Sequence, residues 1–246
     1  MSADAPVLIL GARSDMALAL AHGFGARGHP LMLALRDPAR LGEAKADLEI
    51  RHKVAVSLHE FDISDLAGHA AFFDSLSQIP HIVVSAVGLM ADQDETVADT
   101  QLTAQIIAAN LTGPALALEE AARRLSTLNV DAAVIGISSV AGDRGRAKNY
   151  AYGAAKAGFT AWLSGMRQKY VETRVHVMTV KPGFVRTAMT EGMDLPGAMT
   201  VDADKAAEVI LKGLDARRQV VYTPKWRIIM GIIGMIPEGI FRKMKF

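Results

Sequence analysis

The chain has 246 residues, of which 50% are hydrophobic and 22% charged, and its formal net charge at pH 7 is +1. This composition excludes general disorder, and the nearly neutral charge gives no electrostatic case for a nucleic-acid partner. There is no cysteine, which excludes disulfides and thiol-ligated metals, and no metal site is expected.

Targeting and membrane-spanning signals are weak. Residues 1–6 lack the basic region of a signal peptide. The longest apolar run, Ile228–Ile236, is about half of the roughly 18 residues that a membrane span requires. A cytoplasmic protein is therefore expected, with one apolar segment near the C-terminus.

Short apolar runs alternate with longer helical segments. The predicted strands are Val7–Leu10, Leu31–Leu35, Val54–His59, Ile82–Ser85, Ala133–Ser138, Val175–Val180 and Val220–Tyr222. The predicted helices are Met16–Arg27, Pro38–Arg51, Asp65–Ser77, Val97–Leu125, Tyr150–Val171 and Ala203–Ala216. Strands that are apolar throughout are typical of parallel sheets covered on both faces.

The pattern predicts an α/β chain with a single-domain Rossmann fold over residues 1–246, built on a seven-stranded doubly wound parallel sheet. Gly183–Thr200 is predicted to be a long loop and a candidate substrate lid.

The turn after the first strand is a candidate phosphate site. Gly11 permits a tight turn that would aim helix N–H groups at a pyrophosphate. Asp15 and Ala17 replace two of the usual three glycines, so an ordinary strand-to-helix turn fits equally well. Asp15 is expected to cap the helix or point away, with Ser14 and backbone amides meeting the phosphate. The predicted dinucleotide contacts here are Gly11, Arg13, Ser14, Asp15 and Met16.

The tip of the second strand bears on the choice of cofactor. Arg36 follows Leu35, and an arginine there favours the 2′-phosphate of NADP(H) over NAD(H). Arg13 adds a second positive charge nearby. The alternative is that both arginines are ordinary surface charges, and Asp37 leaves room for NAD.

Three residues carry the chemistry. Ser139 lies at the end of a buried strand, and Tyr152 and Lys156 are four residues apart on one helix face. We expect the Lys156 ammonium to lower the pKa of the Tyr152 phenol from about 10, which would make Tyr152 a workable proton donor to a carbonyl. Ser139 can hold the same carbonyl oxygen by a hydrogen bond.

In order and spacing, these residues together with Gly11, Asn110 and Pro182-Gly183 resemble the short-chain dehydrogenase/reductase family over nearly the whole chain. The resemblance implies an oxidoreductase that moves a hydride between a nicotinamide dinucleotide and a carbonyl or alcohol. It implies that Tyr152 is the catalytic acid/base, that Ser139 orients the substrate and that Lys156 binds the nicotinamide ribose. It further implies that Asn110 supports a water-linked proton relay, although Asn110 alone would be a packing residue.

The resemblance also implies further dinucleotide contacts. Asp62, followed by Ile63, matches the family's adenine contact, although an N-cap fits nearly as well. The family's Asn-Asn-Ala-Gly stands here as Ser85-Ala86-Val87-Gly88, which puts the details of cofactor binding in doubt. The contacts predicted in these segments and beside the nicotinamide are Asp62, Ile63, Ala86, Gly88, Tyr152, Lys156, Pro182, Gly183, Val185 and Thr187.

A narrower resemblance is carried by residues 138–146 and 236–243, which are similar to decaprenylphosphoryl-2-keto-ribose reductases. It implies a ketone on a polyprenyl-phosphate-linked pentose. Arg144, Arg146 and Lys148 would then lie beside Ser139, where a phosphate could be held. The alternative is a solvated basic loop.

The tail, residues 224–246, concentrates positive charge. It holds five basic residues and one acid, a formal charge of +4, whereas the remaining 22 basic and 25 acidic residues give −3. Pro237 is predicted to break the tail into two helical pieces. The apolar run between basic and aromatic residues suits peripheral contact with the inner face of a membrane. The alternative is a cover over the substrate pocket or an oligomer interface.

Two other functions remain open at this point. One is a soluble reductase of an ordinary ketone, and the other is a cofactor-sensing protein that has lost catalysis. An intact set of Asn110, Ser139, Tyr152 and Lys156 argues against the sensor, which needs no proton donor. The resemblance suggests a homodimer or homotetramer formed through the Val97–Leu125 and Tyr150–Val171 helices.

Overall fold

The computed structural model describes residues 4–192 and 195–244. Within them, a seven-stranded sheet forms in which every pairing is parallel. Its strands, in spatial order, are β3 (Val56–Glu60), β2 (Leu31–Leu35), β1 (Val7–Leu10), β4 (Ile82–Ser85), β5 (Ala132–Ile137), β6 (Val175–Lys181) and β9 (Val220–Tyr222). The prediction of a single-domain, doubly wound Rossmann fold is confirmed.

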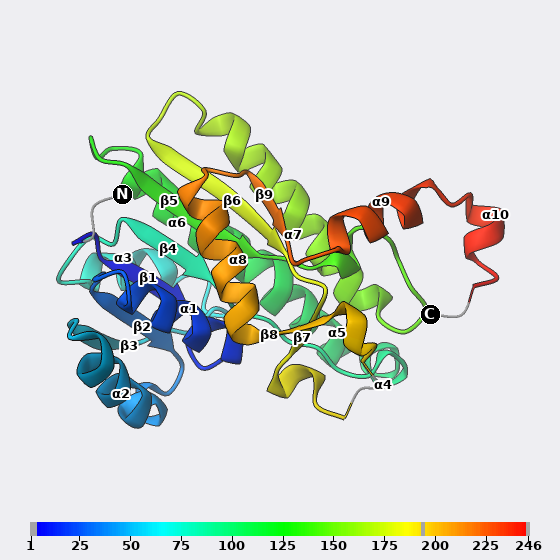
Figure 1. Cartoon of the computed structure of the whole chain (residues 1–246), viewed down its shortest axis with the longest axis horizontal. Coiled ribbons are helices and arrows are strands. Elements are labelled where there is room, and N and C mark those ends of the chain that lie inside the picture. The colour runs from blue at the N-terminus through cyan, green and yellow to red at the C-terminus, as the bar shows by residue number, and fades with distance from the viewer. Residues whose placement is uncertain (1–3, 193–194, 245–246) are drawn as a thin grey trace.

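Helices cover both faces of this sheet. One face carries α1 (Asp15–Gly25), α2 (Gly42–His52) and α8 (Ala203–Asp215), and α1 and α8 lie side by side across it (Figure 1). The other carries α3 (His69–Ser75), α6 (Gly113–Leu125) and α7 (Tyr150–Lys169). Two separate apolar clusters result, one on each face. Burial on both sides explains why the strands are apolar throughout.

The direction of strand order reverses at β1. This strand pairs with β2 on one side and β4 on the other, with Leu10 beside Ala34 and Ser85. Ligands of open α/β sheets bind at such a switch point, beyond the carboxyl ends of the strands. The turns that begin at Gly11 and Ala86 both leave the sheet there. A ligand is therefore expected at this edge.

The prediction of one continuous helix over Val97–Leu125 is wrong, because this segment is divided into shorter helices. The chain forms α4 (Gln93–Ala98), α5 (Thr100–Ile107), a π-helical turn at Ala108–Thr112 and then α6. The break occurs at Asp99, whose carboxylate accepts hydrogen bonds from the N–H groups of Gln101 at 2.8 Å and Leu102 at 3.3 Å. Such a cap starts a new helix where apolar periodicity alone would continue the old one.

The predicted loop Gly183–Thr200 is partly ordered as strand. Short strands β7 (Phe184–Arg186) and β8 (Thr200–Asp202) pair in parallel, and Arg186 and Asp202 form an ion pair at 2.8 Å. Short 3₁₀ turns occupy Ala188–Thr190 and Gly197–Met199. The pairing satisfies backbone groups that a free loop would leave to water.

The tail forms two helices, as predicted, with Pro237 between them. These are α9 (Trp226–Met235) and the short α10 (Glu238–Phe241), which reach away from the sheet in Figure 1. Trp226 and Met230 are buried against Val140. Among the described residues, no helix has the length and apolarity needed to cross a membrane.

Candidate active site

Close packing fixes Ser139 against α7. Ser139 follows β5, and its Oγ accepts a hydrogen bond from the N–H of Ala141 at 3.1 Å. At Gly142, a Cβ atom would lie 2.6 Å from the backbone N of Ala157 and 2.7 Å from the carbonyl carbon of Lys156. Only glycine allows this turn to rest directly on the helix backbone, and the contact sets Ser139 relative to the side chains at the start of α7.

Ser139, Tyr152 and Lys156 are brought together. The hydroxyl groups of Ser139 and Tyr152 share a hydrogen bond. The Lys156 side chain is buried, its Nζ donates to the carbonyl oxygen of Ile137 at 2.9 Å, and it lies 5.7 Å from the centre of the Tyr152 ring. The sequence spacing therefore corresponds to one compact cluster beyond the ends of β5 and β6.

The electrostatics differ from the expectation. Burial raises the pKa of Tyr152 to about 12, against the opposing effect of the hydrogen bond with Ser139. Burial also lowers the pKa of Lys156 to about 7. The predicted lowering of the phenol pKa is not found, because desolvation dominates and the Lys156 Nζ engages Ile137. At neutral pH the phenol carries its proton, as a proton donor to a carbonyl requires.

Asn110 lies in the π-helical turn and is completely buried. Its Nδ2 donates to the carbonyl oxygens of Leu89 at 2.6 Å and Ile106 at 2.8 Å, and its Oδ1 accepts from the N–H of Leu89 at 3.3 Å. A Cβ on Gly88 would lie 3.4 Å from that Oδ1 and 4.0 Å from the Lys156 Nζ. Asn110 thus fastens the segment after β4 beside Lys156, and its part in a water relay stays a prediction.

The turn after β1 fits a dinucleotide phosphate. Gly11 has a φ of +77°, and a Cβ there would lie 2.8 Å from Cγ2 of Val87 and 3.0 Å from its backbone N. The turn and the Ala86–Gly88 segment are therefore in contact. Ser14 caps α1 by accepting from the N–H of Ala17 at 3.2 Å. A tight glycine turn at the N-terminus of an eleven-residue helix is suited to a phosphate.

Asp15 does not cap α1, since Ser14 does, and its carboxylate is bonded to a distant segment of the chain. Its Oδ2 accepts a hydrogen bond of 2.7 Å from the N–H of Ala188, 173 residues further along the chain. Ala188 belongs to the turn that begins at Thr187, whose N–H donates to the Thr190 Oγ1 at 3.1 Å. The carboxylate therefore ties the glycine turn to the segment after β7, the strand in which Val185 is buried.

At the tip of β2, Arg36 is exposed, as is Arg13 in the glycine turn. Neither guanidinium has a hydrogen bond or ion pair among residues 4–192 and 195–244. Asp37 is engaged differently, since its carboxylate accepts from the Arg40 Nε at 2.9 Å. The residues present at this tip thus offer cations rather than a free carboxylate.

Asp62 lies in a turn and does not cap a helix, because α3 begins only at His69 with Gly68 as its N-cap. Its Oδ1 accepts from the N–H of Ser64 at 2.8 Å. Ile63 is buried beside α6, and a Cβ on Gly113 would lie 2.5 Å from its carbonyl oxygen. The segment after β3 is therefore fixed at the same edge of the sheet as the other predicted contacts.

The Pro182-Gly183 segment is covered by the tail. The Pro182 carbonyl accepts from the N–H of Val140 at 3.0 Å, and the Gly183 N–H donates to the Thr223 Oγ1 at 2.9 Å. A Cβ on Gly183 would lie 1.9 Å from the Trp226 Nε1, so the indole rests directly on this glycine. The first residue of α9 thus packs on the strand end next to the Ser139 turn.

Arg144 is not available to bind a phosphate, although the sequence suggested that role for it. Its guanidinium is occupied by the tail. Its Nη1 donates to the carbonyl oxygens of Ile233 and Ile236 at 3.2 and 2.9 Å, and its Nη2 donates to Glu238 at 2.6 Å. The guanidinium also stacks on the Phe241 ring at 4.1 Å. These contacts satisfy the carbonyl groups at the end of α9, so Arg144 holds the tail.

A second polar cluster was missed. Asp143 forms an ion pair with Lys181 and accepts from the Tyr222 hydroxyl at 3.1 Å. It joins the Ser139 turn to the ends of β6 and β9. The available signal was Lys181, a cation between the predicted apolar strand Val175–Val180 and Pro182.

Comparison with known proteins agrees with this geometry. The family described as short chain dehydrogenase matches residues 5–195. An uncharacterized oxidoreductase of Mycobacterium tuberculosis is 32% identical over 245 residues, covering 98% of this chain and 97% of the relative.

Two solved structures show the same fold. A short-chain dehydrogenase from Sphingobium yanoikuyae in complex with NADPH superposes with a TM-score of 0.80 at 23% identity, covering 98% of this chain and 96% of the other. A short chain dehydrogenase/reductase from Burkholderia phymatum in complex with NAD has a TM-score of 0.81 at 19% identity, covering 100% and 97%. The chain belongs to the short-chain dehydrogenase/reductase family and is an NAD(P)-dependent oxidoreductase acting between a carbonyl and an alcohol.

Proposed function

We propose that this enzyme reduces a ketone, with Tyr152 donating the proton. The observation that carries the proposal is the hydrogen-bonded pair of Ser139 and Tyr152 beside the buried Lys156, with the phenol protonated at neutral pH. Ser139 holds the carbonyl oxygen, and the phenolic proton neutralises the oxygen as negative charge develops on it. The reduced nicotinamide, when bound, supplies the hydride.

The chain's own residues would hold the dinucleotide along the edge of the sheet. The Gly11 turn and the N-terminus of α1 would bind the pyrophosphate. Lys156, next to Gly88, would bind the nicotinamide ribose. The direct test is steady-state oxidation of reduced dinucleotide with a panel of ketones. No turnover of any ketone, together with tight dinucleotide binding, would favour a sensing role instead.

We propose further that NADP(H) is preferred over NAD(H). Arg36 and Arg13 are exposed near the phosphate turn, and Asp37 is bound to Arg40. Arg36→Ala should weaken NADPH binding at least tenfold and leave NADH binding nearly unchanged, since losing a charge-assisted contact costs roughly 1.5–3 kcal/mol. The measurement is dinucleotide titration of both cofactors.

Arg51→Ala is the matched control for this experiment. Arg51 is an exposed arginine on α2, paired with Asp47 at 2.7 Å. It should change neither affinity. Equal losses of NADPH and NADH affinity in Arg36→Ala would show that Arg36 does not read the 2′-phosphate.

The substrate we propose is a sugar-like or polyprenyl-phosphate-linked ketone. The support is the apolar cluster beside the Ser139 turn, in which Val140, Trp226 and Met230 are buried and Phe184 and Ile233 are partly buried. Trp226 and Phe184 meet edge to face at 5.1 Å. The partly buried Phe184 and Ile233 would offer apolar surface to a long group attached to the reacting sugar. An ordinary bulky ketone is the second candidate, and the same surface would accept it.

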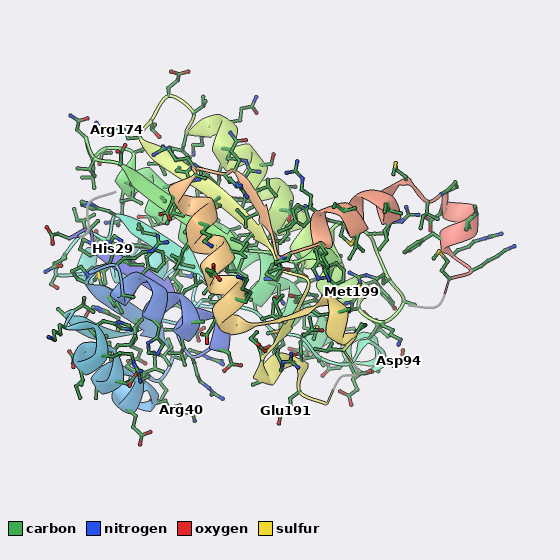
Figure 2. All side chains as sticks on the ribbon, viewed as in Figure 1. His29, Arg40, Asp94, Arg174, Glu191 and Met199 are labelled. Carbon is green, nitrogen blue, oxygen red and sulfur yellow. The ribbon has the colours of Figure 1, made fainter. Side chains whose placement is uncertain are left out.

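We also propose that the tail contacts a membrane peripherally, at its inner face. Ile228, Ile232 and Met235 are 72%, 56% and 76% exposed. Their spacing places them on one face of α9, away from the buried Trp226 and Met230. Basic residues flank this face, and each can add roughly 1 kcal/mol of attraction to anionic lipid. In Figure 2, α9 and α10 extend away from the sheet.

The double variant Ile228→Glu with Ile232→Glu should therefore abolish flotation with anionic vesicles. The matched control is Ile50→Glu, because Ile50 is 79% exposed on α2 and far from the tail in sequence. Wild-type binding should weaken as salt is raised, since screening reduces attraction between exposed charges. Absence of salt-sensitive flotation by the wild type would contradict membrane contact and leave α9 as a pocket cover.

We propose that a homodimer or homotetramer forms through the helices of residues 97–125 and through α7. Exposed apolar side chains occur on these helices and their neighbours, namely Val97, Ile107, Tyr150 and Trp162. Burying such side chains against a second copy would remove apolar surface from water.

A further inference from the structure

A groove of about 640 Å³ lies between the loop after the Ser139 turn and the end of the tail. Three cationic side chains line it, Arg146 and Lys148 from the loop and Arg242 from the tail. Tyr150 and Phe241 contribute aromatic surface. Two segments almost a hundred residues apart in sequence thus place positive charges around the same groove. These charges repel one another, and a bound anion would reduce that repulsion.

Two buried polar atoms in this loop lack protein partners among the described residues. The Arg146 Nε is buried and has no hydrogen-bond partner among the described residues, and the same holds for the Oδ1 of Asn149 on the same turn. Lys148 and Arg242 are exposed and form no ion pair within residues 4–192 and 195–244. A buried donor without a partner is costly and calls for a ligand.

The acid at the rim does not cancel these charges. Glu238 lines the groove, but its carboxylate is paired with Arg144 at 2.6 Å. Arg144 also holds α9 and stacks on Phe241. Among the described residues, Arg146, Lys148 and Arg242 are therefore left without an ion pair, although the carboxylate of Asp143, itself paired with Lys181, attracts Arg146 from a distance. The apolar Met244 also lines the groove.

The groove is separate from the catalytic cluster but adjacent to it in the chain. Arg146 and Lys148 lie between Ser139 and Tyr152, and Tyr150 lies two residues before Tyr152 on α7. Residues two apart on a helix point to different sides. An anion in the groove would thus lie beside, and not within, the site where the carbonyl reacts.

We propose that this groove binds a phosphoryl group, held by Arg146, Lys148 and Arg242. Guanidinium groups match the oxygens of phosphate in geometry as well as charge. The inference rests on the proposed function, since the phosphoryl group would belong to the substrate whose ketone lies at Tyr152. A phospholipid headgroup at the membrane has the same chemistry and is the other source.

The test is calorimetric titration of the full chain with farnesyl phosphate, with farnesol as the uncharged comparison. Wild type should bind farnesyl phosphate at least tenfold more tightly than farnesol, and inorganic phosphate should compete. Arg146→Gln should remove about tenfold of that affinity, the loss of one charge-assisted contact. Because Arg146 is partly buried and its variant could misfold, Lys148→Gln, at an exposed position, is the second variant and should weaken binding in the same direction.

Arg174→Gln is the matched control, at the far end of the molecule in Figure 2 and paired with Asp131 at 3.1 Å. It should leave farnesyl phosphate affinity unchanged. The two variants could weaken binding to phosphatidylglycerol vesicles and leave binding to farnesyl phosphate unchanged. In that case the groove binds a phosphoryl group, and the group belongs to a lipid headgroup. Equal affinity for farnesyl phosphate and farnesol, or no effect of either variant on any probe, would overturn the proposal.

Ketone turnover by wild type separates the two proposals. If wild type binds farnesyl phosphate through the groove but reduces no ketone, the proposed function fails and the groove stands. If it reduces ketones while the groove variants bind both farnesyl phosphate and phosphatidylglycerol vesicles as wild type does, only the groove fails.

Discussion

Tyr152→Phe should lower kcat for ketone reduction by about 10²–10⁴-fold while leaving dinucleotide affinity nearly unchanged. The substitution removes one hydroxyl and keeps the ring. That hydroxyl is hydrogen-bonded to Ser139, and burial raises its pKa to about 12, so it carries the transferable proton throughout the neutral range. The measurements are single-turnover reduction and an independent dinucleotide titration.

Tyr170→Phe is the control, because Tyr170 lies at the other end of the same helix and its hydroxyl donates to Glu119 at 2.9 Å. It should lose stability by about 1 kcal/mol and keep kcat. Retention of more than about a tenth of kcat in Tyr152→Phe would mean that another group donates the proton.

The fold could be predicted from the sequence because the strands that the fold buries are the same segments that are apolar throughout. Val7–Leu10, Leu31–Leu35 and Ile82–Ser85 have the predicted bounds, since each is a short apolar run that a polar or glycine-containing turn ends at the edge of the sheet. The helix break at Asp99 was not predictable from apolar periodicity. It depends on whether one carboxylate bonds to neighbouring N–H groups, and aspartate occurs within helices as well as at their ends.

Residue spacing predicted the grouping of Ser139, Tyr152 and Lys156 but not their electrostatics. Spacing fixes which side chains share a helix face, whereas a pKa depends on how much water the whole fold removes. The role of Arg144 was hidden for a similar reason. Its acceptors are carbonyl groups 89 and 92 residues away, and backbone carbonyls leave no trace in a sequence.

Lys156→Met should abolish turnover, weaken dinucleotide binding and yet stabilise the fold at neutral pH. Lys156 is 2% exposed, and burial lowers its pKa from 10.5 to about 7. Between these two values the unfolded chain binds a proton that the folded chain does not. The free energy of unfolding of wild type therefore rises as the pH increases from about 7 to 10.5. The cost of burying Lys156 is greatest at and below pH 7, on the order of 5 kcal/mol.

Methionine fills similar space without charge, but it leaves the carbonyl of Ile137 without the hydrogen bond of 2.9 Å, a loss of about 1–3 kcal/mol. A net gain of about 2–4 kcal/mol at pH 7 is expected, and it should shrink toward pH 10 as wild type recovers. Urea unfolding of both proteins at pH 7 and pH 10 measures this difference. Lys169→Met, which removes an exposed lysine of the same helix paired with Glu119, should change stability by less than about 1 kcal/mol. If the Lys156→Met difference were the same at both pH values, Lys156 would titrate alike in the folded and unfolded chain, and the stabilisation would have to come from packing alone.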